Sequence, residues 1–218
     1  MIKYYSQFHQ DKILDEEIFI GKTNGFFIDV GAFRLFLSNT MFFEEHRKWD
    51  GICIEPHPNH AEELRGARKT NIEELAILNR TGVSNFTAID GYADALSGIS
   101  EFYDKQFVER VKSETKEEER RTIEVKVDTL QNVIDKYGVY DIDYCSIDVE
   151  GAELEVLKSI DFSKTNIHCF TIENQYDDPK IIRSFLLEKG YGLWKPKKNL
   201  YPNSKCSIAI DDVFIRGL

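Results

Sequence analysis

Four acidic side chains stand where apolar segments, predicted to be buried β-strands, come to an end; they are Asp29, Glu55, Asp148 and Glu173. In open α/β sheets, ligands bind at the carboxyl ends of the strands, so these carboxylates are expected to meet at one sheet edge. Neighbouring anions repel one another, and four of them make sense only around a metal ion or around a cationic or hydroxyl-rich ligand. S-adenosylmethionine is such a ligand, because it carries a sulfonium, an ammonium and a ribose.

Residues 144–153 bring two carboxylates to one strand end. An apolar run ends in Asp148 and Glu150, and the residues that follow have helical spacing. Both carboxylates therefore lie where a strand gives way to a helix, in position to meet a ligand. A purely structural interpretation is the alternative, since Glu150 and Glu153 also favour a helix N-terminus by their charge.

The first two predicted strands carry a pattern typical of nucleoside binding. Gly31 follows Asp29 closely, and a glycine there lets the backbone approach a ligand whose amine or hydroxyls the acid accepts. Glu55 ends the second strand about two dozen residues later, where an acid holds ribose hydroxyls in such folds. Between them, the apolar loop 33–37 is predicted to be buried, and Ser38 or Asn39 is predicted either to cap the next helix or to contact the ligand.

The remaining pattern predicts one α/β domain without a linker. Residues 105–121 are densely charged and predict a solvated helix, and His46 and His60 are predicted to lie on helix surfaces. We assign residues 1–24 to an N-terminal helical cap on the cofactor site and 84–127 to an inserted strand, loop and charged helix. Further strands are predicted over 72–78, 84–89, 122–127, 191–194 and 207–215, and further helices over 58–68, 128–138 and 179–190.

The composition excludes two classes of protein. The net charge of −10 argues against a surface for bare nucleic acid, and no apolar run approaches the roughly 20 residues that span a bilayer. The first residues lack the apolar core of a signal peptide, so a cytoplasmic location is expected. Cys53, Cys145 and Cys169 fall in predicted strands and are interpreted as reduced core thiols.

Together, these residues resemble the FkbM-type S-adenosylmethionine-dependent methyltransferases over nearly the whole chain. The resemblance implies a three-layer, Rossmann-like class I methyltransferase fold, with a mostly parallel seven-stranded sheet and an antiparallel C-terminal strand. It also implies O-methylation, commonly of a sugar or of a related natural-product hydroxyl. The matching segments are 5–7 with 10–11, 27–32, 38–40, 51–56, 96–98, 128–130 and 147–151.

The resemblance also assigns roles to individual residues. It places Asp29 and Gly31 in the first cofactor motif, makes Glu55 the acid that binds ribose, and puts Asp148 in the signature at the fourth strand. The polar residues Gln7, Ser38 and Asn39 match positions near the methionine end of the cofactor. One departure is clear: similar proteins carry about one more residue in the loop 33–37, often with a glycine or proline, and this chain has neither there.

Methyl transfer needs an acceptor hydroxyl held in line with the sulfonium carbon and a base for its proton. Asp148, Glu150 and Glu173 are the predicted bases, and His57 is a lower-ranked candidate. His9 and His57 both lie beside motif residues, which makes each a candidate for a catalytic part. Alternatively, Asp148 and Glu173 with the adjacent Asn174 could ligate a divalent cation that acidifies the hydroxyl.

Other functions stay open at this level. A nucleotide-sugar or NAD-binding protein is disfavoured, because no GxGxxG motif follows the first strand to seat a pyrophosphate. A non-catalytic module on the same fold is a second alternative, since a fold does not guarantee chemistry. The acceptor, the oligomeric state and membership of a longer chain are not determined by the pattern.

Overall fold

Seven strands form the main sheet of the computed structural model, which describes residues 2–174, 179–198 and 200–218. Met1, part of the predicted N-terminal cap, lies outside these ranges. The strand order is β10-β11-β9-β8-β1-β2-β3; the strands from β9 to β3 pair in parallel, and β11 is antiparallel to both neighbours. The predicted α/β class and mostly parallel seven-stranded sheet are confirmed, consistent with a Rossmann-like fold. The strands are β1 (Phe26–Val30), β2 (Asp50–Ile54), β3 (Asn71–Glu73), β8 (Asp141–Ile147), β9 (Asn166–Glu173), β10 (Tyr191–Trp194) and β11 (Asp211–Arg216).

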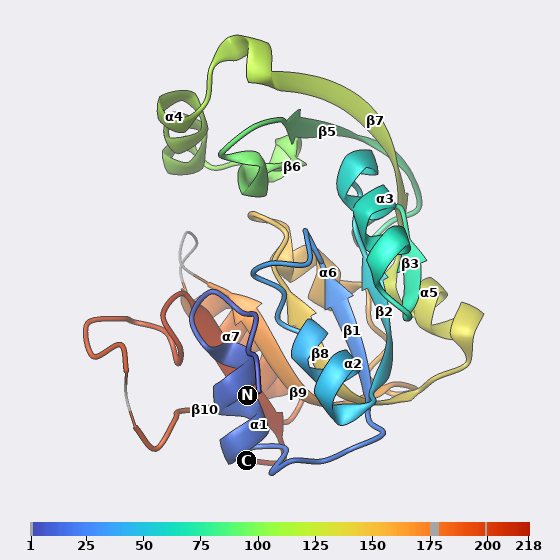
Figure 1. The fold of residues 1–218 in the computed structure, drawn as a ribbon, viewed down its shortest axis with the longest axis vertical. Helices are drawn as coiled ribbons and strands as arrows, with labels where there is room; N and C mark the ends of the chain where they lie inside the picture. Colours follow the sequence, from blue (N-terminus) through green and yellow to red (C-terminus); the bar gives the residue numbers. More distant parts are fainter. Residues whose placement is uncertain (1, 175–178, 199) are drawn as a thin grey trace.

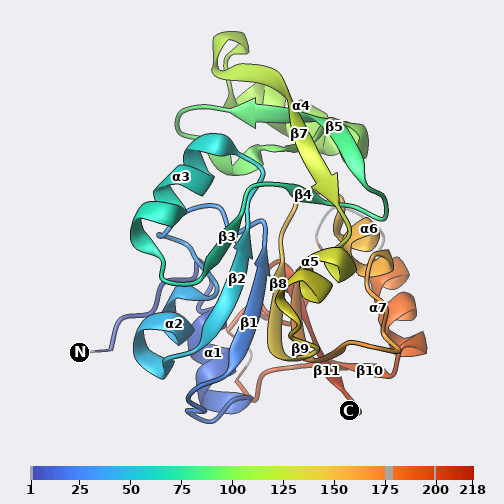
Figure 2. The ribbon, with the colours of Figure 1, turned by 90° about the vertical axis from the view of Figure 1, so that its right-hand side faces the viewer.

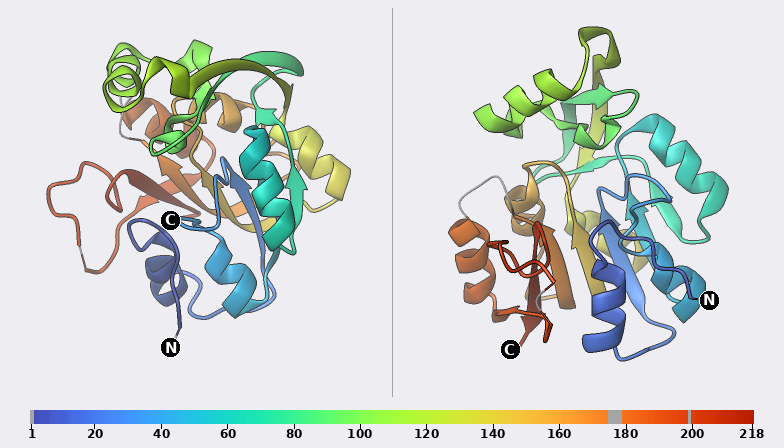
Figure 3. Two further views of the ribbon diagram at one scale, coloured as in Figure 1. Left: turned by 45° about the horizontal axis from the view of Figure 1, so that its top comes forward. Right: turned by 60° about the vertical axis from the view of Figure 1, so that its left-hand side comes forward.

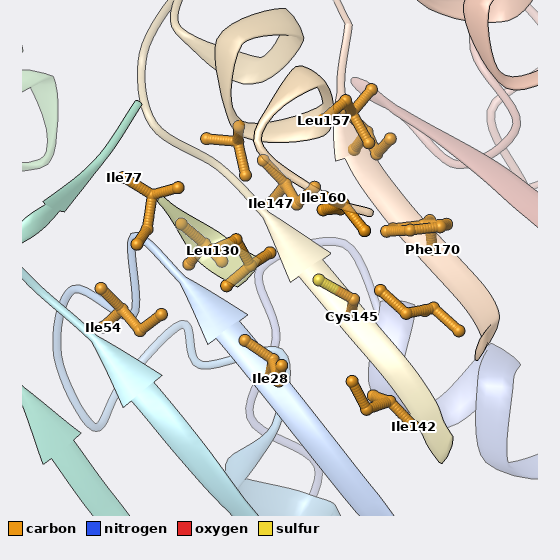
Figure 4. Close-up of a cluster of buried hydrophobic side chains, with 14 of the residues drawn as sticks. Ile28, Ile54, Ile77, Leu130, Ile142, Cys145, Ile147, Leu157, Ile160 and Phe170 are labelled. Atoms are coloured by element: carbon orange, nitrogen blue, oxygen red, sulfur yellow. The ribbon is translucent and has the colours of Figure 1, made fainter. Parts of the chain in front are cut away.

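Helices cover both faces of this sheet (Figure 2). Successive strand residues point to opposite faces, so Phe27 packs with side chains of α1, α2 and α3, and Ile28 packs with those of α5, α6 and α7. Figure 4 shows the second of these cores, in which Leu130 and Leu157 from the helices lie in one cluster with Phe170 of β9. No helix in the described ranges has the length and apolar character needed to cross a membrane. The helices are α1 (Gln10–Glu17), α2 (Met41–Arg47), α3 (Pro58–Ala67), α5 (Leu130–Tyr137), α6 (Glu153–Lys158) and α7 (Pro179–Glu188).

A second, four-stranded sheet lies beyond the carboxyl ends of the main strands (Figures 1 and 3). The single strand predicted over 72–78 is wrong, because the chain leaves β3 of the main sheet and enters β4 of the second within that run. The break falls at Glu73 and Glu74, between Ile72, which is partly buried, and the buried apolar run 75–78, and the prediction joined the apolar residues on both sides of it. The strand order is β4-β7-β5-β6, formed by β4 (Ala76–Ile77), β5 (Gly82–Ile89), β6 (Gly98–Ile99) and β7 (Arg120–Asp128).

The charged segment between β6 and β7 forms helix α4 (Lys105–Glu114), which is shorter than the predicted helix over 105–121. Asp104 caps it by accepting a hydrogen bond from the Phe107 backbone N–H at 2.6 Å. Phe107 and Val111 are buried, so α4 packs on the second sheet with one apolar edge. Three short 3₁₀ segments flank these elements: η1 (Asp94–Leu96), η2 (Ser100–Phe102) and η3 (Glu117–Glu119).

Hydrogen bonds to the Asp11 carboxylate shape the segment before α1. This side chain accepts from the Tyr5 backbone N–H and from the Ser6 hydroxyl, each at 2.6 Å. Ser6 also forms a parallel β-bridge with Leu37. The N-terminal segment is thereby held beside the loop 33–37, close to the carboxyl end of β1.

A buried arginine connects the ends of α2 and α3. Arg68 donates to the Glu44 carboxylate at 2.7 Å, to the Ser38 hydroxyl at 3.2 Å and to the Thr40 hydroxyl at 3.0 Å. Thr40 in turn donates to Asp29 at 2.6 Å. The ion pair therefore fixes the segment after β1 and, through it, the first carboxylate of the sheet edge.

We predict that Arg68→Met lowers the free energy of unfolding by about 3–5 kcal/mol, because it leaves the Glu44 carboxylate buried without a cation. Urea unfolding followed by circular dichroism measures this loss. The matched control is Arg65→Ala, which removes a half-exposed pair with Glu74 in the same region and should cost less than about 1 kcal/mol. Equal losses in the two variants would show that Arg68 has no special role.

Candidate functional site

A pocket of about 270 Å³ opens at the carboxyl ends of β1, β2, β8 and β9. Residues of the second sheet, among them Phe86 and Gly98, complete its lining. The structure brings the residues assigned to the cofactor and the three carboxylates predicted as bases into this one lining: Gln7, Asp29, Gly31, Ser38, Asn39, Glu55, Asp148, Glu150 and Glu173. Their predicted roles are a separate matter and depend on the contacts described next.

Glu55 is held by two backbone donors. Its carboxylate accepts from the Phe33 N–H at 2.8 Å and from the His57 N–H at 2.7 Å. Burial raises the pKa of Glu55 to about 8, the two backbone hydrogen bonds act in the opposite direction, and the Asp29 and Asp148 charges add to the rise. A proton therefore remains on this carboxyl near neutral pH until a ligand supplies hydrogen bonds or positive charge.

Asp29 is buried on β1, and its neighbours partly stabilise its charge. Burial raises its pKa, whereas the hydrogen bond from Thr40 and the nearby Arg68 guanidinium lower it. Asp148 raises the pKa of Asp29 again from the neighbouring strand end. The two acids thus share one electrostatic environment, as expected for carboxyl ends of paired parallel strands.

The backbone packing around Gly31 requires a glycine at this position, whether or not a ligand binds. Its φ is +79°, and a Cβ placed on it would lie 1.7 Å from the carbonyl oxygen of Asp148. The sequence interpretation attributed this glycine to the approach of a ligand. The contact across β1 and β8 is the stronger requirement, although Gly31 also lines the pocket.

Ser38 and Asn39 differ in whether they leave a hydrogen-bonding atom for a ligand. The Ser38 hydroxyl accepts from the backbone N–H groups of Thr40 and of Met41, the first residue of α2, at 3.3 and 3.1 Å. The N-cap position itself is held by Thr40, so the predicted cap at Ser38 or Asn39 lies one or two residues too early. Asn39 donates to the Ser146 hydroxyl at 3.1 Å, and its Oδ1 is buried with no hydrogen-bond partner among the described residues. A buried acceptor of this kind suits a donor on a ligand.

The N-terminal segment contributes a wall of the pocket. Gln7 lines it from an exposed position, and Gln10 lines it from a buried one. The Gln10 amide donates to Asp211 at 2.5 Å, which ties α1 to the start of β11. Gln10 was not among the predicted site residues, because the first helical residue of a short amphipathic segment gives no sign of what it faces.

Three carboxylates form a cluster at the ends of β8 and β9. Asp148, Glu150 and Glu173 each offer an oxygen within 4.8 Å of the others. Burial raises the pKa of all three, and the Asp148 and Glu173 side chains share a hydrogen bond. Glu150 has a left-handed φ of 56°, and its Oε2 is buried without a hydrogen-bond partner in the described part of the chain. The cluster is therefore suited to hold a proton or a cation.

Asn174, the third predicted metal ligand, lies outside the lining of this pocket. Its amide nitrogen donates to Asp212 at 2.8 Å. The carboxylates that lie together are those of Asp148, Glu150 and Glu173, so Glu150 takes the place expected for Asn174.

Arg110 on α4 is a site residue that the sequence pattern did not reveal. It is the only lysine or arginine among the described residues that line the pocket. Its charge lowers the pKa of both Asp148 and Glu150, against the larger effect of burial. Arg110 also pairs with Glu114 at 2.9 Å, in the i,i+4 pattern of an ordinary solvated helix. Only the folding of the second sheet over the main sheet brings it to the pocket.

His46 is exposed on α2, as predicted, whereas His60 is not at a helix surface. His60 was predicted on a helix surface, and this is wrong, since it is 2% exposed and lines the pocket. The second sheet covers this side of α3, where the His60 ring lies 3.3 Å from Asp94. His57 is buried behind it and, like His9, is absent from the lining.

The loop 33–37 is more exposed than predicted. Phe36 is 53% exposed and Leu37 is 39% exposed, so the expectation of burial is wrong for these two side chains. Phe33 and Leu37 have φ values of 51° and 68° and line the pocket. Left-handed positions, usually taken by glycine, thus occur at both ends of a loop that contains none.

A comparison with protein families agrees with this geometry. The family described as "Methyltransferase FkbM domain" matches residues 21–193, which is most of the chain and includes all four strand-ending acids. The chain therefore belongs to the FkbM methyltransferase family, and the resemblance found in the sequence is confirmed. The match begins after α1, so Gln7 and Gln10 lie outside it. No curated protein matched the chain.

We predict that the free protein loses stability as pH rises, because Glu55 binds its proton more tightly in the folded state than in the unfolded state. The effect of Glu55 develops between its ordinary pKa of 4.5 and the raised value of about 8. Glu55→Gln should make this decline shallower by up to about 1.4 kcal/mol per pH unit in urea unfolding. Glu62→Gln, at an exposed position of α3, is the control. Parallel curves for wild type and Glu55→Gln would contradict the assignment.

Proposed function

We propose that this protein is an S-adenosylmethionine-dependent O-methyltransferase that acts on a hydroxyl of a sugar or glycan. The observation that supports it most is that Asp29, Glu55 and Asp148, at the ends of three adjacent strands, line one pocket. The family match covers all three residues. The class I methyltransferase arrangement of the sheet is part of this proposal.

The acceptor groups of the pocket fit the cofactor. Glu55, at the end of β2, would hold the ribose hydroxyls, with its carboxylate already oriented by two N–H donors. The buried Oδ1 of Asn39 and the Asp29 and Asp148 carboxylates would hold the methionine end, whose ammonium needs acceptors. When bound, the cofactor supplies a methyl group activated by the sulfonium.

The chain's own part in the reaction is to orient the acceptor hydroxyl and to remove its proton. We favour Glu150 among the three predicted bases, because Asp148 and Glu173 bond to each other, which leaves Glu150 as the member of the cluster outside that pair. Burial raises the pKa of Glu150, with further increases from the Asp148 and Glu153 charges, which makes it a stronger base than an exposed glutamate. His57 remains the lower-ranked candidate.

A divalent cation among the same carboxylates is the alternative way to reduce their repulsion. It would bind oxygens of Asp148, Glu150 and Glu173 and acidify the acceptor hydroxyl directly. We favour a proton, because Asp148 and Glu173 already share a hydrogen bond and Arg110 lines the same pocket. We place the reaction in the cytoplasm, since the four cysteines are free thiols.

The test is formation of S-adenosylhomocysteine from S-adenosylmethionine with a panel of sugars, glycans and small phenolic or macrocyclic alcohols. We predict turnover with a sugar acceptor, unaffected by excess chelator, and a drop in kcat of at least about a hundredfold for Glu150→Gln. Glu155→Gln removes a carboxylate that pairs with Lys158 on the same helix and should retain full activity.

Three other results would redirect the proposal. Turnover restricted to natural-product alcohols would show that the acceptor is a natural-product hydroxyl and not a sugar. Loss of activity in chelator, restored by Mg²⁺, would establish the metal mechanism. Cofactor binding without turnover on any acceptor would make the protein a non-catalytic module of the family.

A further inference from the structure

Arg34, in the loop 33–37, forms an ion pair across the mouth of the pocket. Its Nη2 lies 2.5 Å from Oδ2 of Asp94, and its Nε lies 3.8 Å from the Glu63 carboxylate. Asp94 is 5% exposed and also contacts the His60 ring at 3.3 Å. Because the Asp94 carboxylate is buried, it depends on these two partners to remain in place.

This ion pair joins the two sheets. Arg34 follows β1 of the main sheet, and Asp94 begins η1, between β5 and β6 of the second sheet. The Asp94 carbonyl accepts from the Ser97 hydroxyl at 2.7 Å, and Ser97 lines the pocket with Leu96. The position of η1, and with it one wall of the pocket, is therefore tied to the main sheet through the Arg34 guanidinium.

The same ion pair adjoins the residue that orients Glu55. Phe33 precedes Arg34 and donates its backbone N–H to the Glu55 carboxylate at 2.8 Å. Phe33 does so with a φ of 51°, which is unfavourable for a bulky side chain. Its ring packs edge-on against His60 at 4.9 Å, and the Arg34 guanidinium lies 5.8 Å from the ring centroid. Contacts around Arg34 thus hold Phe33 in the conformation that directs its N–H to Glu55.

We propose that Arg34 is a positioning residue for cofactor binding, acting through its ion pair with Asp94. The pair holds the second sheet over the Glu55 side of the pocket and keeps the Phe33 N–H directed at the Glu55 carboxylate. This inference rests on the proposed function, because it assigns the nucleoside end of S-adenosylmethionine to that side of the pocket.

The first test is calorimetric titration of Arg34→Gln with S-adenosylmethionine, together with steady-state kinetics. We expect the Kd and the KM for the cofactor to rise roughly tenfold, with kcat at saturating cofactor changed less than about twofold. Arg34→Lys, which keeps the charge but not the planar fork, should show a smaller increase of about threefold. Thermal melting confirms that each variant is folded.

The matched control is Arg121→Gln. Arg121 pairs with Asp90 at 3.1 Å within the second sheet region, and both side chains are about half exposed and absent from the pocket lining. The cofactor Kd of this variant should equal that of wild type. A general weakening of the second sheet would raise Kd in both variants and would contradict a specific role for Arg34.

A double-mutant cycle distinguishes an ion pair from two independent residues. Asp94→Asn should raise the cofactor Kd about as much as Arg34→Gln, and the double variant should be no weaker than either single variant. Losses that multiply in the double variant, or single variants that bind like wild type, would overturn the proposal. Failure of the wild-type protein to bind would refute the proposed function together with it.

Discussion

Burying several carboxylates at one sheet edge is unfavourable unless each finds donors or positive charge, and the surroundings of the pocket supply these one by one. Asp29 receives the Thr40 hydroxyl, which Arg68 fixes in turn. Glu55 receives two backbone N–H groups, and Asp148 shares a hydrogen bond with Glu173. This compensation is incomplete, since burial still raises the pKa of each of these four acids. The pocket is consequently prepared for a ligand that brings hydroxyls and positive charge.

The two sheets have different parts in this arrangement. The main sheet supplies the acids, because its parallel strands bring their carboxyl ends to one edge. The second sheet and the segments that connect its strands cover the pocket. Arg110 supplies positive charge beside the acid cluster, and Asp94 joins this cover to Arg34, which follows β1 of the main sheet. In the proposed function, the cofactor binds mainly to the main sheet, and the exclusion of water from the reacting atoms depends on the second sheet.

The sequence predicted the part of this site that depends on strand position. Asp29, Glu55, Asp148 and Glu173 follow buried parallel strands, whose continuous apolar character is visible in the chain, and all four line one pocket. The second sheet was not predicted, because its strands come from separate parts of the chain and their pairing leaves no mark on the sequence pattern. His60 was assigned to a helix surface because the residues that cover it, such as Asp94, are distant in sequence. Arg110 was assigned to a solvated helix because the charge pattern of 105–121 does not show that this helix lies over the pocket. The exposure of Phe36 was missed because composition alone does not show which side chains of an apolar loop face the solvent.

The most direct test of the account is to measure the protons exchanged when S-adenosylmethionine binds. Calorimetric titrations of the wild-type protein at pH 7, in buffers of different ionisation enthalpy, give this number. Burial raises the pKa of Glu55 to about 8, so the free protein holds a proton there, and a cationic, hydroxyl-bearing ligand should displace it. The account predicts binding with net proton release. Absence of binding, or binding with no release of protons, would contradict the claim that these buried carboxyls form the cofactor site.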